Sequence, residues 1–384
     1  MSKTKINKII EQLLLLLMLF FSINEKTTTI LFFPILFLVI YRKITFNFLK
    51  EYYLLPILYI IFFITSIQPE IKFSFDSLEK KALFIIAPLI FYNIKINSKQ
   101  KIKFLKFFYY GIILSIIITI SYSFLGKYIG VFDFLFNYKR SDLFFKSFQW
   151  HYPFNGIYLS MYYLFALVSI VIFRKEMLLT KFQFVFSVVL ISIFIFQISS
   201  VIGLILFFVL ISFMIYKKRF KYNKLIFLVL SVFLLFSCFY FLDIKSILGT
   251  RYYTWKSAIN ILFDTFIYGN GNVSQNKLDS MYIESFINDN ATFQLKLGLN
   301  SHNLYLQLLL EGGLILLLVF LTLIFKFYKV VSGFNKKLKL ISYCFLIIIL
   351  ITSMGESILN TYIGISFFCV FYCLLIKKEE VQST

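Results

Sequence analysis

Long apolar runs recur along the whole chain and constrain its fold more than any other feature. As helices, runs of about 20 residues cross roughly 30 Å of hydrocarbon. Hydrophobic residues make up 60% of the sequence, and the mean hydropathy is +0.85, whereas soluble domains average roughly 45–50% apolar residues. We therefore predict an all-α integral membrane protein, with residues 1–384 as one polytopic domain. Residues 9–23 are expected to be a span, because no small-residue cleavage site follows them.

The apolar runs predict about twelve transmembrane helices, with both termini on the same side of the membrane. The runs lie at about 9–23, 27–41, 52–67, 82–94, 104–124, 156–173, 182–198, 200–216, 225–241, 303–325, 340–354 and 357–376. The stretch 182–216 is too long for one crossing, and we place its turn at Ser199-Ser200.

Basic residues predict the orientation of these spans. The formal net charge of +21 is large enough to suggest a nucleic-acid partner, but the lysines and arginines form short clusters between apolar runs. With the N-terminus inside, the inner segments hold most of the 39 basic residues, as the positive-inside rule requires. We therefore predict cytoplasmic termini and no nucleic-acid partner.

Two larger loops, at about 125–155 and 242–301, then lie on the outer face. His151 and His302, the only histidines, stand at the ends of these loops. The loops also contain Arg140 and Arg251. Because the inner segments contain no ATP-type phosphate loop, the energy for any reaction is expected from the substrate itself or from a gradient.

The four cysteines all lie within apolar runs. This placement predicts neither a disulfide framework nor a zinc site, and it favours packing as small apolar residues.

His302 stands in "LGLNSHNLYLQLLLEGG", residues 297–313. Ser301 is the expected N-cap, so that the helix begins at about His302. The positive end of the helix dipole disfavours protonation there, and a neutral imidazole suits a general base. The N–H groups of the same helix start suit an anion such as phosphate. The alternative is an interfacial histidine without chemistry.

Asn303, Gln307 and Glu311 follow at four-residue steps and share one helix face. A carboxylate within a span usually faces a polar cavity or a partner. The three side chains are therefore expected either to line a substrate site or to join helices through polar contacts. Gly312-Gly313 is expected to let a neighbouring helix approach closely, which is a packing role.

Arg251 opens "RYYTWKSAINILFDTFIYGNGN", an interfacial, partly amphipathic helix followed by a turn. Its planar guanidinium suits a phosphate clamp, although snorkelling to head groups is the alternative. Trp255 lies one turn later. The turn at 269–272 is expected to place backbone amides, such as that of Gly271, near a ligand. Because no strand precedes it, a dinucleotide site is not predicted.

His151 lies in "QWHYPFNGIYLSMYYLFAL". Trp150, Tyr152 and Pro153 form an aromatic entrance that suits a sugar or a prenyl chain, while an aromatic belt with an incidental histidine is the alternative.

The order of these motifs resembles that of the O-antigen ligase and O-antigen polymerase family of polytopic membrane glycosyltransferases. The resemblance is carried by Arg251-x3-Trp255, Gly269-x-Gly271 and "SHNLYLQ" with Glu311-x-Gly313, after the largest outer loop. "LEKKALFIIAPLIF" and "HYPFNGIYLSMYYLFAL" also look like segments of family members.

The resemblance implies a GT-C-like membrane fold and a metal-independent reaction without a cofactor. The expected donor is a glycan linked through pyrophosphate to undecaprenol, and the acceptor is a hydroxyl of a glycan or of lipid A-core. Transfer takes place at the outer face of the bacterial inner membrane. His302 is then the base and Arg251 holds the pyrophosphate, while Asn303, Gln307, Glu311, Arg140, His151, Trp255 and Gly271 line the substrate site.

Two positions depart from the family pattern. Ligases often carry an arginine after a serine at the turn before the eighth span, where this chain has Val201 after Ser200. Either Arg140 or a lysine of the first loop is expected to substitute, or the donor is bound differently. The departure favours a polymerase over a ligase. Leu316 replaces a second glycine, with packing as the expected consequence. A twelve-span transporter or flippase is the competing reading, although the two halves of the chain lack a convincing repeat.

Overall fold

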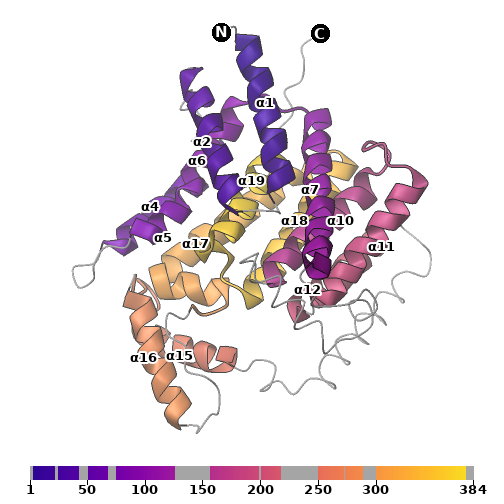
Figure 1. Cartoon of the computed structure of the whole chain (residues 1–384). Coiled ribbons are helices and arrows are strands. Elements are labelled where there is room, and N and C mark those ends of the chain that lie inside the picture. Colours follow the sequence, from indigo (N-terminus) through magenta and orange to yellow (C-terminus); the bar gives the residue numbers. More distant parts are fainter. Residues whose placement is uncertain are drawn as a thin grey trace.

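The computed structural model describes residues 3–21, 25–42, 51–67, 75–125, 156–198, 200–217, 250–271, 273–288 and 300–377. All secondary structure in these ranges is helical (Figure 1). The elements are α1 Lys3–Phe20, α2 Glu25–Tyr41, α4 Leu54–Ser66, α5 Phe75–Lys81, α6 Leu83–Asn93, α7 Ser98–Leu125, α10 Gly156–Phe173, α11 Lys181–Gln197, α12 Val201–Lys217, α15 Thr250–Thr265, α16 Val273–Asn288, α17 Leu304–Ser332, α18 Lys336–Gly355, the 3-10 turn η1 Ile358–Asn360 and α19 Tyr362–Ile376.

Four helices of the described residues are long and apolar enough to cross a membrane, namely Ser98–Ser121 of α7, α10, α17 and α18. Shorter apolar helices lie in α2, α4, α11, α12 and α19. The chain is therefore a helical membrane protein, and the number of twelve spans stays a prediction. The expected span 225–241 and the loop 125–155 lie outside the described residues.

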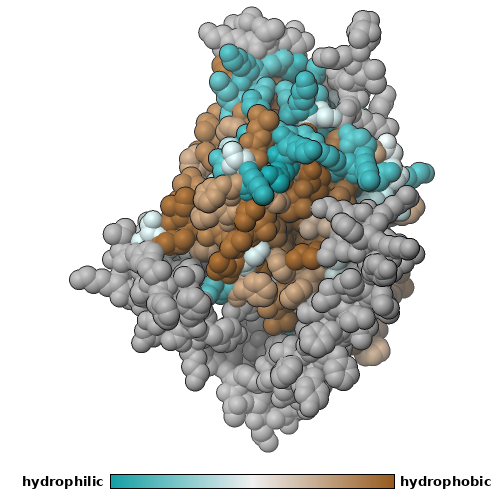
Figure 2. Space-filling model, turned by 90° about the vertical axis from the view of Figure 1, so that its right-hand side faces the viewer, coloured by the Kyte–Doolittle hydropathy of each residue, from teal (hydrophilic) through white to brown (hydrophobic). Residues whose placement is uncertain are grey.

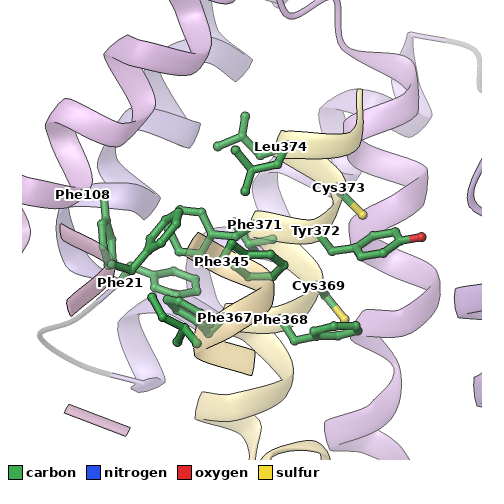
Figure 3. Packing of buried hydrophobic residues seen from close by; sticks show 14 of the residues in the cluster. Phe21, Phe108, Phe345, Phe367, Phe368, Cys369, Phe371, Tyr372, Cys373 and Leu374 are labelled. Atoms are coloured by element: carbon green, nitrogen blue, oxygen red, sulfur yellow. The ribbon is translucent and has the colours of Figure 1, made fainter. Parts of the chain in front are cut away.

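α10 and α19 form the centre of the helix bundle, because both are apolar on all sides and so bury every face. α19 is buried from its second residue to its last. Its Phe371 lies among aromatic rings (Figure 3), with ring centroids 4.6 Å from Phe165 and 4.9 Å from Phe108. Cys369 and Cys373 are buried on the same helix, which confirms their packing as apolar residues.

Basic side chains from three predicted inner segments meet at one end of the bundle, the lysine-rich end. Lys377 donates to the carbonyl oxygens of Phe91 at 2.6 Å and Tyr92 at 3.0 Å. Arg42 donates to Asn93 O at 3.1 Å, and Lys101 donates to the carbonyls of Leu375 and Lys377. Cations at helix C-termini satisfy carbonyls that lack helical partners. Figure 2 shows hydrophilic residues gathered at one end, above a hydrophobic band.

At the other end of the bundle, α15 packs against α17, and α16 packs against α15 (Figure 1). Their small apolar core consists of Ala258, Ile261, Leu262, Leu278, Tyr282 and Leu310. The predicted helix that begins near Arg251 is thereby confirmed as α15.

Candidate active site

His302 lies in a tight turn immediately before α17. Its φ of +46° falls in the left-handed region, which costs a non-glycine residue of order 1–3 kcal/mol and persists only where the surroundings hold it. The backbone N–H of His302 donates to Asn300 Oδ1 at 2.9 Å. On the preceding residue, Ser301 Oγ donates to Asn303 O at 2.7 Å. Side-chain contacts on both sides of the histidine thus fix this conformation.

The N-cap of α17 is Asn303, which corrects the expectation that Ser301 caps a helix beginning at His302. Asn303 Oδ1 accepts from the N–H groups of Tyr305 at 3.0 Å and Leu306 at 3.2 Å. An asparagine oxygen suits this position as well as a serine oxygen does. His302 therefore lies just outside the helix, and its backbone N–H points to Asn300.

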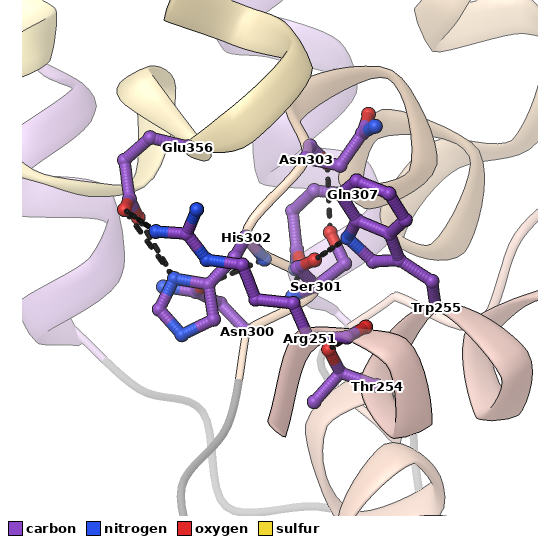
Figure 4. Close-up of polar contacts among 9 residues, drawn as sticks. All are labelled: Arg251, Thr254, Trp255, Asn300, Ser301, His302, Asn303, Gln307 and Glu356. Atoms are coloured by element: carbon purple, nitrogen blue, oxygen red, sulfur yellow. Dashed lines mark hydrogen bonds and ion pairs between the residues drawn. The ribbon is translucent and has the colours of Figure 1, made fainter. Parts of the chain in front are cut away.

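Glu356 joins His302 to Arg251 (Figure 4). His302 Nδ1 lies 3.2 Å and 3.3 Å from the two carboxylate oxygens of Glu356, and Arg251 Nη2 lies 3.9 Å from Glu356 Oε2. The Glu356 side chain is only 3% exposed, while those of His302 and Arg251 are each 29% exposed. A buried carboxylate thus holds an imidazole and a guanidinium that both remain partly exposed.

The carboxylate of Glu356 also favours one tautomer of a neutral His302 imidazole. Because a carboxylate accepts hydrogen bonds, it favours the proton of a neutral imidazole on Nδ1. Nε2 then carries the free lone pair, and it has no hydrogen-bond partner among the described residues. An Nδ1–H bound to a carboxylate with Nε2 open is the arrangement of a general base with an orienting acid.

α15 brings Arg251 to the site and anchors the histidine turn at the same time. Arg251 lies in the first turn of α15. One turn later, Trp255 Nε1 donates to Ser301 O at 2.8 Å. The structure thus uses the one polar group of Trp255 to hold the turn, whereas the sequence suggested a substrate contact. Arg251 and His302, 51 positions apart in sequence, are fixed relative to each other by this bond.

Gln307 and Glu311 hydrogen-bond to protein groups, which favours polar contacts between helices over a substrate-lining role. Gln307 Oε1 accepts from Ser301 N at 2.9 Å, and Gln307 Nε2 donates to Glu311 Oε1 at 2.7 Å. Glu311 also binds Lys81 Nζ at 3.0 Å and Asn360 Nδ2 at 2.8 Å. Both residues are shielded from solvent, with Gln307 6% exposed.

Asn303 likewise uses both the oxygen and the nitrogen of its side-chain amide for contacts within the protein. Besides capping α17, it donates from Nδ2 to Met354 O at 3.2 Å. It therefore ties the start of α17 to the end of α18, close to Glu356.

Gly271 does not offer its amide to a ligand, contrary to the prediction. Gly271 N donates to Glu311 O at 2.9 Å, and Asn270 N donates to Leu310 O at 2.6 Å. These two carbonyls can accept from the turn because α17 is interrupted at Gly313, whose φ is +64° and ψ is −160°. A close approach at Gly312-Gly313 is confirmed, since a Cβ on Gly313 would lie 2.1 Å from Ile267 O, but the approaching backbone is the turn after α15 rather than a helix.

The turn before α12 lies beside this site. α11 ends at Gln197 and α12 begins at Val201, as the expected turn at Ser199-Ser200 requires. A Cβ on Gly355 would lie 1.6 Å from Ile202 Cδ1 and 3.8 Å from Arg251 Nη1. Ile202 and Arg251 therefore both lie against Gly355. Val201, where the family pattern has a second arginine, precedes Ile202 in the sequence. Arg140 and His151 lie outside the described residues.

Glu356 and Lys81 are charged site residues that the sequence did not single out. Glu356 is the only carboxylate between the apolar runs 340–354 and 357–376. A lone acidic residue in so short a turn between two spans could have indicated a polar site there. Lys81 precedes the run at 82–94, but nothing in its spacing indicates a partner 230 positions away.

Comparison with known proteins adds no relative: the sequence matches no family model and no curated protein. Among the described residues, no group of three His, Cys, Asp or Glu side chains is arranged to hold a metal ion. The resemblance to the O-antigen ligase and polymerase family accordingly rests on the motifs alone.

Proposed function

We propose that the chain transfers a glycan from a polyprenyl pyrophosphate, such as undecaprenyl pyrophosphate, to an acceptor hydroxyl at the outer face of the bacterial inner membrane. The observation that carries the proposal is the shared carboxylate of Glu356, which holds His302 and Arg251 together at the end opposite the lysine-rich end. A base and a planar cation beside each other suit a donor that carries its own phosphate leaving group.

In the proposed reaction, His302 Nε2 accepts the proton of the acceptor hydroxyl while the hydroxyl oxygen attacks the anomeric carbon. The bond from that carbon to the pyrophosphate oxygen breaks, and the carrier pyrophosphate leaves with the electron pair. The guanidinium of Arg251 binds this anion. The negative charge of Glu356 stabilises the imidazolium that forms on His302. No ATP is required, because the donor supplies the leaving group.

The test is transfer by the purified protein in liposomes that contain a lipid-linked glycan and an acceptor. Wild-type protein is expected to release the carrier pyrophosphate and to form glycan product. His302→Ala and Arg251→Ala are each expected to lower transfer by about 10²- to 10⁴-fold while the protein still inserts. Arg174→Gln, at a basic side chain stacked on Phe184, is the control. Normal polymer length and normal attachment of the glycan in both site variants would exclude this mechanism.

The choice between polymerase and ligase follows from the lipid-linked species that accumulates in a deletion strain. Because Val201 stands where ligases often have an arginine, we expect single repeat units to accumulate, as for a polymerase. Accumulated long chains would indicate a ligase instead. Lipid flipping by the reconstituted protein without any glycan transfer would favour the transporter function.

A further inference from the structure

A buried ion pair joins Lys81, the last residue of α5, to Glu311, which lies one helical turn after Gln307 in the apolar part of α17. Lys81 Nζ is 3.0 Å from Glu311 Oε2, and the two side chains are 8% and 13% exposed. The ammonium also lies 3.8 Å from the centroid of the Phe62 ring. A charged pair at such a place is costly in a membrane protein, and the proposed transfer chemistry touches neither side chain directly. A role through other residues is therefore required to explain it.

The carboxylate of Glu311 fixes the direction of every hydrogen bond around it. It can only accept, and it accepts from Lys81 on Oε2 and from Gln307 and Asn360 on Oε1. Since the amide nitrogen of Gln307 must face Glu311, its oxygen must face the other way. That oxygen accepts from Ser301 N at 2.9 Å, next to the strained backbone of His302.

We propose that Lys81 and Glu311 are positioning residues that hold the His302 turn through Gln307. The catalytic consequence rests on the proposed function, but the hold on the turn does not. Lys81 fixes the carboxylate, the carboxylate orients the amide of Gln307, and that amide fixes Ser301. The left-handed conformation of His302 then keeps Nδ1 against Glu356. Loss of any one of these contacts is expected to loosen the turn without altering the groups that contact substrate.

Gln307→Met tests the link between the ion pair and the turn, because it removes both amide contacts at similar side-chain length. Backbone amides of residues 300–306 are expected to exchange with deuterium at least about ten-fold faster, while those of α18 are unchanged. In the transfer assay, kcat is expected to fall about 10- to 100-fold with little change in KM for the donor. Thr322→Val, which removes another hydrogen-bonding side chain of α17, is the matched control. Unchanged exchange over 300–306 would overturn the proposal.

A swap of the two side chains tests the direction of the hydrogen bonds. Gln307→Glu alone sets two acceptors against each other and is expected to lower kcat and speed exchange. Adding Glu311→Gln places an amide donor at position 311 opposite the carboxylate at position 307. The double variant has the same net charge as the wild-type protein. Asn360 can turn its amide to match, since its Oδ1 has no partner among the described residues. The double variant is therefore expected to recover at least ten-fold of the lost kcat and the slow exchange. No recovery in either measurement would overturn the proposal.

The exchange measurements need no substrate, so they separate the two proposals. If exchange responds as expected and wild-type protein transfers no glycan, the proposed function fails and the hold on the turn stands. If transfer depends on His302 and Arg251 while exchange in Gln307→Met stays at the wild-type rate, the function stands and the positioning role fails.

Discussion

The side chains at the His302 end are held in place before any substrate binds. His302 shares a buried carboxylate with Arg251, and its turn is fixed by Trp255 and Gln307. A reacting group that is already oriented needs little rearrangement during the reaction, which is a large part of what active sites contribute. The polar side chains of the turn thus each form a contact that holds the turn or orients His302.

Glu356→Gln tests the carboxylate at the residue scale. The amide is nearly the same size, but it lacks the charge that pairs with Arg251 and that stabilises an imidazolium on His302. We expect kcat for glycan transfer to fall about 10²-fold or more, with little change in melting temperature. Glu284→Gln, an exposed carboxylate on α16, is the control. Wild-type kcat in Glu356→Gln would show that His302 works without its orienting acid.

The interruption of α17 is the decisive feature at the scale of elements. Gly313 leaves the helical conformation, and the carbonyls of Leu310 and Glu311 then accept from the turn after α15. The N–H of Leu314 in turn donates to Phe266 O at 2.9 Å. These bonds fix α15, and with it Arg251, against the helix that begins beside His302.

Gly313→Ala is expected to be strongly destabilising. The φ of +64° and ψ of −160° lie in a region that is almost restricted to glycine, and the new Cβ would lie 2.1 Å from Ile267 O. We expect a loss of at least about 1–3 kcal/mol of unfolding free energy, measured as a lower melting temperature in detergent. Gly333→Ala, at the C-cap of the same helix, is the matched control, because its nearest contact would be 3.7 Å away. Equal melting temperatures for the two variants would contradict the role of the interruption.

At the scale of the whole molecule, the two ends of the helix bundle differ in chemistry. One end collects Arg42, Lys101 and Lys377 on helix C-termini. The other end carries α15, α16 and the candidate active site (Figure 1). The predicted membrane orientation follows the excess of basic residues at the first end.

Cysteine labelling tests that orientation. Lys175→Cys and Gln275→Cys place thiols at exposed positions of the two ends. Cys344, Cys369 and Cys373 are buried, and Cys238 is replaced by serine. In spheroplasts, a membrane-impermeant maleimide is expected to label Gln275→Cys at once and Lys175→Cys only after lysis. The reverse result would place the candidate site in the cytoplasm.

The sequence by itself determined the helical membrane fold, because long apolar runs have no other stable solution in lipid. It also singled out His302, which precedes the apolar run 303–325, and Arg251 in the loop before it, as candidate site residues. It could not identify the role of Trp255, because a tryptophan near a membrane interface has several ordinary roles.

Only the tertiary structure decided what these residues contact. Glu356 lies 54 positions from His302, and Lys81 lies 230 positions from Glu311, so no periodicity connects the partners. The conformation of Gly313 is likewise set by the turn after α15 rather than by its own helix. Local spacing indicates which groups a helix carries, whereas the packing of separate helices determines which groups meet, and the candidate active site depends on that packing.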